Sequence, residues 1–293
     1  MSRARPRLIG SVAAGVAAVL LAACSSGSTP AVRHGTAAPS ASSSASASAS
    51  SSSVPAFTIA QLTSPTGQPE VLVRPRGTVR GLVVFMHGLG ADQDQIAQMP
   101  QLEAVGDELV QAGYAIVASY AHGDNFGNPI SVKDQRLAVA DARARLGGVR
   151  QVDILAFSMG GLDALLTAAS HRIEGLHALA LISPATDQRS FTTGQFAQRL
   201  SAAYGDPGPS RLRADLDRSD PMLQPASHYA GYAYRFWHSP DDTTVPVEQS
   251  LSMSRHLARA GILADVSPLT GDHGDLSQLD PDDVLQLFES STT

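Results

Sequence analysis

Short apolar runs alternate with longer amphipathic segments over residues 71–288. The runs that predict strands are 71–73, 82–86, 114–119, 152–156, 176–182, 232–237 and 264–267. Helices are expected at about 94–112, 132–146, 162–169, 247–260 and 281–288. Strands that alternate with helices of this length are typical of a mostly parallel sheet with helices on both faces. The pattern therefore predicts an α/β domain within residues 56–293.

The alternation is interrupted between residues 185 and 228. This stretch is polar and proline-containing, with only weak helical patterning between 191 and 204. We expect a small lid-like insertion over the carboxyl edge of the sheet, before strand 232–237.

The first 55 residues have a different composition from the rest of the chain. Residues 1–23 carry a basic start and an apolar stretch too short for a comfortable membrane span, as in a secretory signal peptide. Residues 24–55 are rich in serine and alanine and lack large apolar side chains, which predicts a disordered tether.

The apolar stretch ends in Leu-Ala-Ala-Cys, with Cys24 as the only cysteine of the chain. This ending resembles a bacterial lipobox, which implies cleavage before Cys24 and lipid, such as palmitate, on its sulfur. The alternative is an ordinary signal peptide with an incidental cysteine. The resemblance implies an exported protein, lipid-anchored to the outer face of the bacterial cell membrane.

Charge and motif content argue against several classes of protein. The net charge of −6 becomes −9 once residues 1–23, with three arginines and no acid, are removed. An acidic protein has no electrostatic reason to bind nucleic acid. The sequence contains neither H-E-x-x-H nor a glycine-rich nucleotide-binding motif, so we expect no metal and no cofactor.

Ser158 stands at the junction between the expected strand 152–156 and the apolar segment 162–169. A serine on a tight strand-to-helix turn is held clear of the backbone, beside the free amides of the helix start. These are the conditions for a nucleophile with a site for developing negative charge. The alternative is a plain turn in which Ser158 only caps the helix.

The pentapeptide Ala-Phe-Ser-Met-Gly at 156–160 resembles the nucleophile elbow, G-x-S-x-G, of the α/β-hydrolase superfamily. Ala156 stands where the first glycine is usual, and a single methyl group is the smallest intrusion there. The resemblance implies an α/β-hydrolase fold. It also implies an acid and then a histidine base after Ser158 along the chain.

The resemblance implies His273 as the base and Asp242 as the acid. His273 lies in a Gly-Asp-His-Gly-Asp loop after the last expected strand, whereas His256 lies inside an expected helix. The family's D-x-x-V-P pattern selects Asp242. Asp241 remains the alternative acid because spacing cannot separate adjacent aspartates, and Asp242 could merely cap the next helix.

The sequence His-Gly-Leu-Gly at 87–90 follows an expected strand and resembles the family's H-G-x-G oxyanion loop. This resemblance implies that the amides of Leu89 and Met159 stabilise the oxyanion. His87 itself is expected to be structural rather than catalytic.

Together these residues imply attack by Ser158 on a carbonyl and hydrolysis of an acyl-enzyme. We expect a hydrolase of carboxylic esters, acting on small to medium substrates outside the cytoplasm. A serine peptidase of the aminopeptidase or prolyl-oligopeptidase type is the first alternative. The second is a non-catalytic surface binding protein on the same scaffold.

Overall fold

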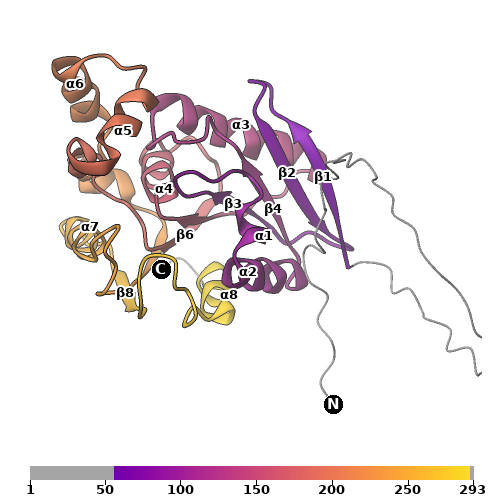
Figure 1. Cartoon of the computed structure of the whole chain (residues 1–293). Coiled ribbons are helices and arrows are strands. Elements are labelled where there is room, and N and C mark those ends of the chain that lie inside the picture. The colour runs from indigo at the N-terminus through magenta and orange to yellow at the C-terminus, as the bar shows by residue number, and fades with distance from the viewer. Residues whose placement is uncertain (1–55, 291–293) are drawn as a thin grey trace, which may run out of the picture. The chain divides into compact units, whose positions relative to one another are not determined.

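An eight-stranded sheet forms the centre of the computed structural model, which describes residues 56–290 (Figure 1). The strands are β1 (Phe57–Thr63), β2 (Pro69–Pro75), β3 (Gly81–Met86), β4 (Tyr114–Ser119), β5 (Val152–Phe157), β6 (Leu176–Ile182), β7 (Ala233–His238) and β8 (Ala264–Pro268). Their order is β1-β2-β4-β3-β5-β6-β7-β8. Strands β3 to β8 pair in parallel, and β2 is antiparallel to both neighbours. The predicted α/β class with a mostly parallel sheet is confirmed.

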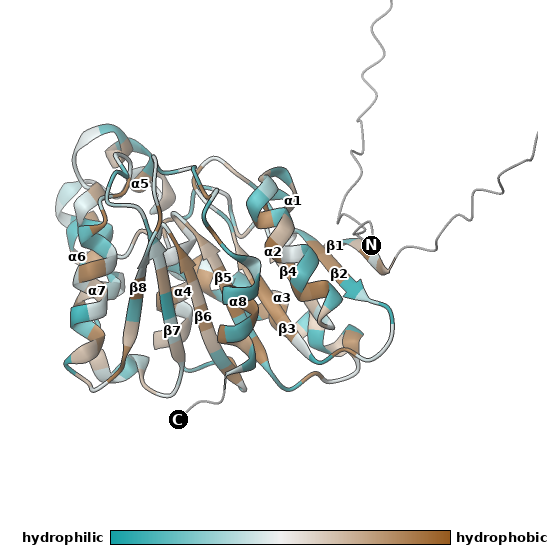
Figure 2. Ribbon diagram, turned by 90° about the horizontal axis from the view of Figure 1, so that it is seen from below, coloured by the Kyte–Doolittle hydropathy of each residue, from teal (hydrophilic) through white to brown (hydrophobic). Residues whose placement is uncertain are grey.

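Helices cover both faces of this sheet. They are α1 (Gln95–Gln98), α2 (Pro100–Gln111), α3 (Pro129–Leu146), α4 (Gly160–Ala169), α5 (Ala197–Ala203), α6 (Pro209–Ser219), α7 (Glu248–Ala258) and α8 (Pro281–Glu289). Helices α2 and α8 pack on one face, and α3, α4 and α7 pack on the other (Figure 2).

Burial explains why the central strands are visible in the sequence. Every residue of β3, β4 and β5 is buried, because helices cover both sides of these strands. Strands of this kind read as nearly continuous apolar runs. Strand β1 is different: it lies at the sheet edge and is mostly exposed. No strand is predicted there, because the large apolar residues Phe57, Ile59 and Leu62 are separated by other residues and form no continuous apolar run.

The single helix expected at 94–112 is wrong, because Pro100 divides this segment into two helices. The segment forms two helices, α1 and α2, with Met99 in an extended conformation between them. Pro100 causes the break, because a residue before proline is disfavoured in the helical region. Pro100 then serves as the first residue of α2, where the missing N–H costs nothing.

The polar stretch 185–228 is more helical than its sequence indicates. It holds four short 3-10 segments together with α5 and α6. Helix α6 follows Gly208, whose φ is +77°, and begins with Pro209. Its residues are mostly exposed, so the apolar periodicity that predicts helices is weak there.

The expected signal segment 1–23, the lipidated Cys24 and the tether 24–55 lie outside the described residues. Within residues 56–290, no helix has both the length and the apolar character needed to span a bilayer.

Candidate active site

Ser158 occupies a strained turn between β5 and α4. Its φ is +55°, a left-handed conformation that is uncommon for residues other than glycine. The turn is held from both sides. The Ser158 N–H donates to Ile182 O at 3.0 Å, and Ser158 O accepts from Ala185 N at 2.9 Å. Such strain persists only where the surrounding structure determines it, and it is concentrated at functional sites.

Glycines after the serine allow the elbow to pack closely. A Cβ added at Gly160 would lie 2.2 Å from Met86 O, and one at Gly161 would lie 2.5 Å from Pro184 Cβ. Ala156 is fully buried in β5, where it pairs with Met86 and Leu181. The close approach therefore falls on the helix side of Ser158, and the methyl group of Ala156 is accommodated within the sheet.

A continuous chain of hydrogen bonds joins Ser158, His273 and Asp242. His273 Nε2 lies 2.7 Å from Ser158 Oγ, and His273 Nδ1 lies 2.6 Å from Asp242 Oδ2. A carboxylate only accepts hydrogen bonds, so the proton of a neutral His273 ring belongs on Nδ1. His273 Nε2 is then free to accept the Ser158 hydroxyl proton, the arrangement that a base-activated nucleophile requires.

The Asp242 carboxylate is buried and fully partnered. Oδ1 accepts from Thr244 N at 2.9 Å and Val245 N at 2.8 Å. Oδ2 accepts from His273 and also faces His238 Nε2 at 3.2 Å. Burial by itself raises the pKa of Asp242, but hydrogen bonds from two imidazoles and a backbone amide hold that pKa well below its usual range. Asp242 therefore remains charged beside His273.

Asp241 takes no part in this network. It is exposed, and its N–H donates to Ser239 Oγ at 3.1 Å. Of the two adjacent aspartates, only Asp242 contacts His273. The same carboxylate also caps the turn that follows, so the capping alternative describes Asp242 Oδ1, while Asp242 Oδ2 serves the imidazole.

A second carboxylate ties the acid loop to the histidine loop. Asp272 Oδ1 accepts from His273 N at 2.8 Å, from Thr243 N at 3.0 Å and from Thr243 Oγ1 at 2.9 Å. The loops that carry Asp242 and His273 are therefore held together by a neighbour of each.

The two expected oxyanion donors lie beside Ser158. Leu89 and Met159 line the same cavity as Ser158 and His273. Within residues 56–290, neither the Leu89 N–H nor the Met159 N–H has a hydrogen-bond partner. Both amides are therefore free to donate to a negatively charged oxygen.

The remaining histidine expectations concern His87 and His256. His87 is buried, with Nδ1 at 2.9 Å from Gly88 O and Nε2 at 2.9 Å from Tyr120 O. His256 is also buried, with Nε2 at 2.9 Å from Gln224 O. Both rings contact backbone carbonyls and neither contacts Ser158, so both are placed as packing residues.

An apolar cavity of about 220 Å³ opens beside the Ser158 hydroxyl. Its lining residues are Gly88, Leu89, Phe126, Phe157, Ser158, Met159, Ala185, Phe191, Phe196, Thr244, Val245 and His273. None of them carries an acidic side chain, and Phe191 and Phe196 come from the insertion 185–228. The cavity suits an uncharged group attached to the carbonyl that Ser158 would attack.

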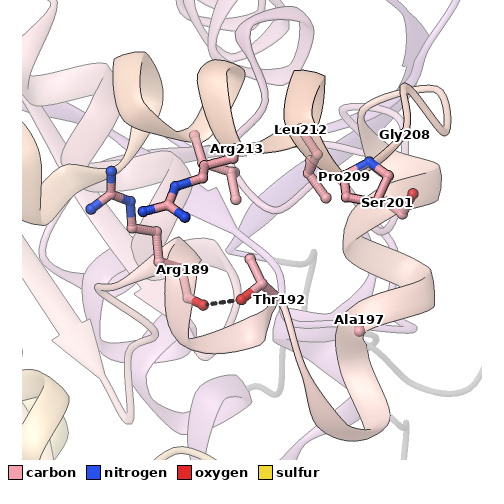
Figure 3. Close-up of a pocket in the computed structure, with 9 residues that line it drawn as sticks. Arg189, Thr192, Ala197, Ser201, Gly208, Pro209, Leu212 and Arg213 are labelled. Atoms are coloured by element: carbon pink, nitrogen blue, oxygen red, sulfur yellow. Dashed lines mark hydrogen bonds between the residues drawn. The ribbon is translucent and has the colours of Figure 1, made fainter.

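A larger cavity of about 440 Å³ lies between α5, α6 and the segment before them (Figure 3). Arg189 and Arg213 line it, together with Leu212 and Leu216. Arg189 also forms an ion pair with Asp217. Neither Ser158 nor His273 lines this space, so it is separate from the hydrogen-bonded chain described above.

Several side chains that support the site are not predicted from the sequence, and Asp272, described above, is one of them. His238 contacts the Asp242 carboxylate, Gln95 accepts from the Gly88 amide, and Asp124 accepts from the Gly90 amide. A histidine at the end of a strand four residues before Asp242 is a signal that could have been used. Gln95 and Asp124 carry no such signal, because their contacts depend on where separate loops meet.

The part of the chain that the structure describes holds no group of three or more His, Cys, Asp or Glu side chains arranged to bind a metal ion.

The family model described as "Alpha/beta hydrolase family" matches residues 83–287. No curated protein matches the sequence. Solved structures resemble the fold. For the Pyrococcus horikoshii acylaminoacyl peptidase, the TM-score is 0.62 at 14% identity, over 80% of this chain and 41% of that protein. For a truncated carbohydrate esterase from gut microbiota, the TM-score is 0.65 at 14% identity, over 80% of this chain and 96% of the esterase. For an S-formylglutathione hydrolase from Staphylococcus aureus, the TM-score is 0.62 at 15% identity, over 80% of this chain and 98% of that hydrolase.

These similarities show a shared fold. The chain spans only 39% to 42% of the length of the peptidases that it matches. The esterase and the formylglutathione hydrolase are covered almost completely.

Proposed function

The chain belongs to the alpha/beta hydrolase family, and we propose from this premise that it is a serine hydrolase that cleaves carboxylic esters of small to medium substrates. The single observation that carries the proposal is the unbroken hydrogen-bond chain from Ser158 through His273 to Asp242. Nucleophile, base and acid are each within direct reach of the next, in the arrangement that acyl transfer requires.

In the proposed reaction, Ser158 Oγ attacks the ester carbonyl while His273 Nε2 takes the hydroxyl proton. Charged Asp242 stabilises the imidazolium that forms, and the amides of Leu89 and Met159 donate to the oxyanion. His273 returns the proton to the departing alcohol, which leaves an acyl group on Ser158. A water molecule then attacks the acyl carbonyl while His273 Nε2 takes one of its protons. The bond to Ser158 Oγ breaks, His273 returns the proton to Oγ, and the carboxylic acid is released.

The cavity favours an ester with an uncharged acyl group over a peptide with a free amino terminus. An aminopeptidase needs an acidic group to hold the substrate ammonium, and no acidic side chain lines the cavity beside Ser158. Aromatic side chains from the insertion supply an apolar surface instead. The lining of the cavity therefore favours ester hydrolysis over aminopeptidase activity.

The test measures turnover of chromogenic esters of graded acyl length, with amino-acid anilides as amide controls, and labelling by a fluorophosphonate. Wild-type protein should hydrolyse the shorter esters and take up the label. Ser158→Ala should do neither and should unfold at the wild-type temperature. Ser170→Ala, at the far end of α4, should behave as wild type. Faster turnover of anilides than of esters would favour the peptidase alternative. Absence of both labelling and turnover would contradict the proposed reaction and leave the binding-protein alternative.

We also propose that the protein is exported and anchored to the outer face of the bacterial membrane by lipid on Cys24. The support is the basic and apolar leader that ends in Leu-Ala-Ala before the only cysteine of the chain. Cys24→Ala expressed in a bacterial host should lose incorporation of labelled palmitate and leave the membrane fraction. Ser25→Ala is the matched control and should remain membrane-bound. Retention of label by the Cys24 variant would contradict the anchor.

A further inference from the structure

Of three consecutive backbone amides in the loop after β3, the first and the third donate to side chains and the second does not. The Gly88 N–H donates to Gln95 Oε1 at 2.7 Å, and the Gly90 N–H donates to Asp124 Oδ1 at 2.6 Å. The Leu89 N–H between them has no partner within residues 56–290. Side chains from outside the loop therefore accept hydrogen bonds from the amides on both sides of Leu89, whereas the Leu89 amide, the expected oxyanion donor, stays free to donate.

Each of the two accepting side chains is itself held in place. Gln95 is largely buried in α1, and its Nε2 contacts Met99 Sδ at 3.7 Å. Asp124 belongs to the loop after β4, and its Oδ2 lies 3.5 Å from Arg199 Nη1 in α5. The loop is thus fixed from the helix that follows it on one side and from a more distant loop on the other.

The loop also has contacts of its own, since Gly88 O, in the same peptide unit as the Leu89 N–H, lies 2.9 Å from His87 Nδ1 and accepts from Ala91 N at 3.3 Å. It contains two glycines, and Gly90 has a φ of +73°. Glycine gives a peptide unit the widest conformational freedom, so a Gly-Leu-Gly segment can rotate the Leu89 amide away from Ser158. The hydrogen bonds from Gly88 N to Gln95 and from Gly90 N to Asp124 restrict that rotation further, because they fix the peptide units on either side of the Leu89 amide. A donor that is oriented before the reaction stabilises the transition state without a reorganisation cost.

We propose that Gln95 and Asp124 are positioning residues that orient the Leu89 N–H toward the oxyanion formed at Ser158. The inference rests on the proposed function, since it assigns these residues to the same acyl-transfer site. Neither residue touches the reacting atoms, so both act through the Leu89 amide.

The test pairs a disruptive with a conservative variant at each position. Asp124→Ala and Gln95→Met remove the accepting oxygen, whereas Asp124→Asn and Gln95→Glu keep one at the same place. The measurements are kcat and KM on a p-nitrophenyl ester and the inhibition constant of an aryl trifluoromethyl ketone. This ketone forms a tetrahedral adduct with the serine and so reports on oxyanion binding. Asp265→Ala, an exposed aspartate of β8, is the matched control.

We expect Asp124→Ala and Gln95→Met to lose roughly ten- to a hundredfold in kcat, with KM changed little and ketone affinity reduced in parallel. The conservative variants should recover most of the loss, and thermal unfolding should show that all variants fold. Arg199→Gln should change kcat less than Asp124→Ala, because the hydrogen bond to Gly90 remains.

Two results overturn the inference in different ways. If the wild type hydrolyses esters but both disruptive variants keep wild-type kcat and ketone affinity, the positioning role fails while the proposed function stands. If the wild type takes up no fluorophosphonate at Ser158, the proposed function fails and the positioning role fails with it. Should Asp124→Ala not fold, the Gln95 pair decides the question alone.

Discussion

The two oxygens of the Asp242 carboxylate contact different groups: Oδ1 contacts backbone amides, and Oδ2 contacts imidazole rings. Oδ1 accepts from the amides of Thr244 and Val245 and fixes the carboxylate in its loop. Oδ2 faces two imidazoles, those of His273 and His238. His238 Nε2 also lies 2.8 Å from Val245 O, and its Nδ1 lies 2.6 Å from Ser250 Oγ. These contacts place the His238 proton on Nε2, directed at two acceptors, with Nδ1 accepting from the serine.

At the residue scale, the adjacent aspartates provide a matched pair of variants. Asp242→Asn should lower kcat about 10⁴-fold, because an amide no longer fixes the His273 tautomer or stabilises the imidazolium. Asp241→Asn should leave kcat within about twofold, since an exposed side chain away from His273 contributes little. Steady-state hydrolysis of one chromogenic ester checks both. The assignment of the acid is wrong if the Asp241 variant shows the large loss.

The residues of the hydrogen-bonded chain could be predicted from the sequence because motif and chain order carry that information. Ser158 stands in a recognisable elbow, and His273 follows the last strand. The supporting residues could not be predicted in this way. Asp124 reaches Gly90 across 34 positions of the sequence, and nothing in the local pattern around either residue indicates that their loops meet.

At the scale of elements, the pairing of β2 with β4 buries an acidic side chain. Glu70 of β2 is opposite Ser119 of β4 and is fully buried. The Ser119 hydroxyl is the polar side chain opposite it, and it offsets only part of the effect of burial. Burial, with a further contribution from nearby Asp141, raises the pKa of Glu70 to about 7. Between pH 4.5 and about pH 7, the Glu70 carboxyl is therefore protonated to a greater extent in the folded protein than in the unfolded chain.

Glu70→Gln should accordingly change how stability depends on pH. The folded state holds the Glu70 proton more tightly than the unfolded state, so the wild type loses unfolding free energy as pH rises from 4.5 to about 7. Glutamine removes this loss. The variant should match the wild type near pH 4 and exceed it near pH 8 by up to about 3 kcal/mol. Urea unfolding at both pH values measures the difference, and parallel stability curves would contradict the prediction.

The sequence predicts elements well where burial is two-sided and poorly where it is not. The central parallel strands β3, β4, β5 and β6 are apolar runs because helices cover both of their faces. Strand β1 and helix α6 are mostly exposed, so they show fewer buried apolar positions than the central elements; in α6, Leu212 and Leu216 pack in an apolar cluster. Pro100 itself predicts the break between α1 and α2, whereas the apolar periodicity alone favours one continuous helix.

At the scale of the whole molecule, residues 56–290 contain both the apolar core and every side chain of the candidate site. A chain that begins at residue 54 should therefore fold, with the same unfolding temperature and the same kcat on a soluble ester as the mature protein. Circular dichroism during heating and steady-state kinetics measure the two quantities. A second chain that begins at Thr66 lacks β1 and should unfold at a lower temperature. A large loss of kcat in the first chain would show that the preceding residues contribute to the site.

Two of the four phenylalanines that line the cavity come from a different part of the chain than the groups that would perform the chemistry. Phe191 and Phe196 belong to the stretch between β6 and β7, whereas Ser158, Asp242 and His273 follow β5, β7 and β8. Selection on this stretch can therefore reshape substrate preference while the reactive groups stay untouched. Grafting the corresponding stretch from a relative is a direct route to new selectivity on this scaffold.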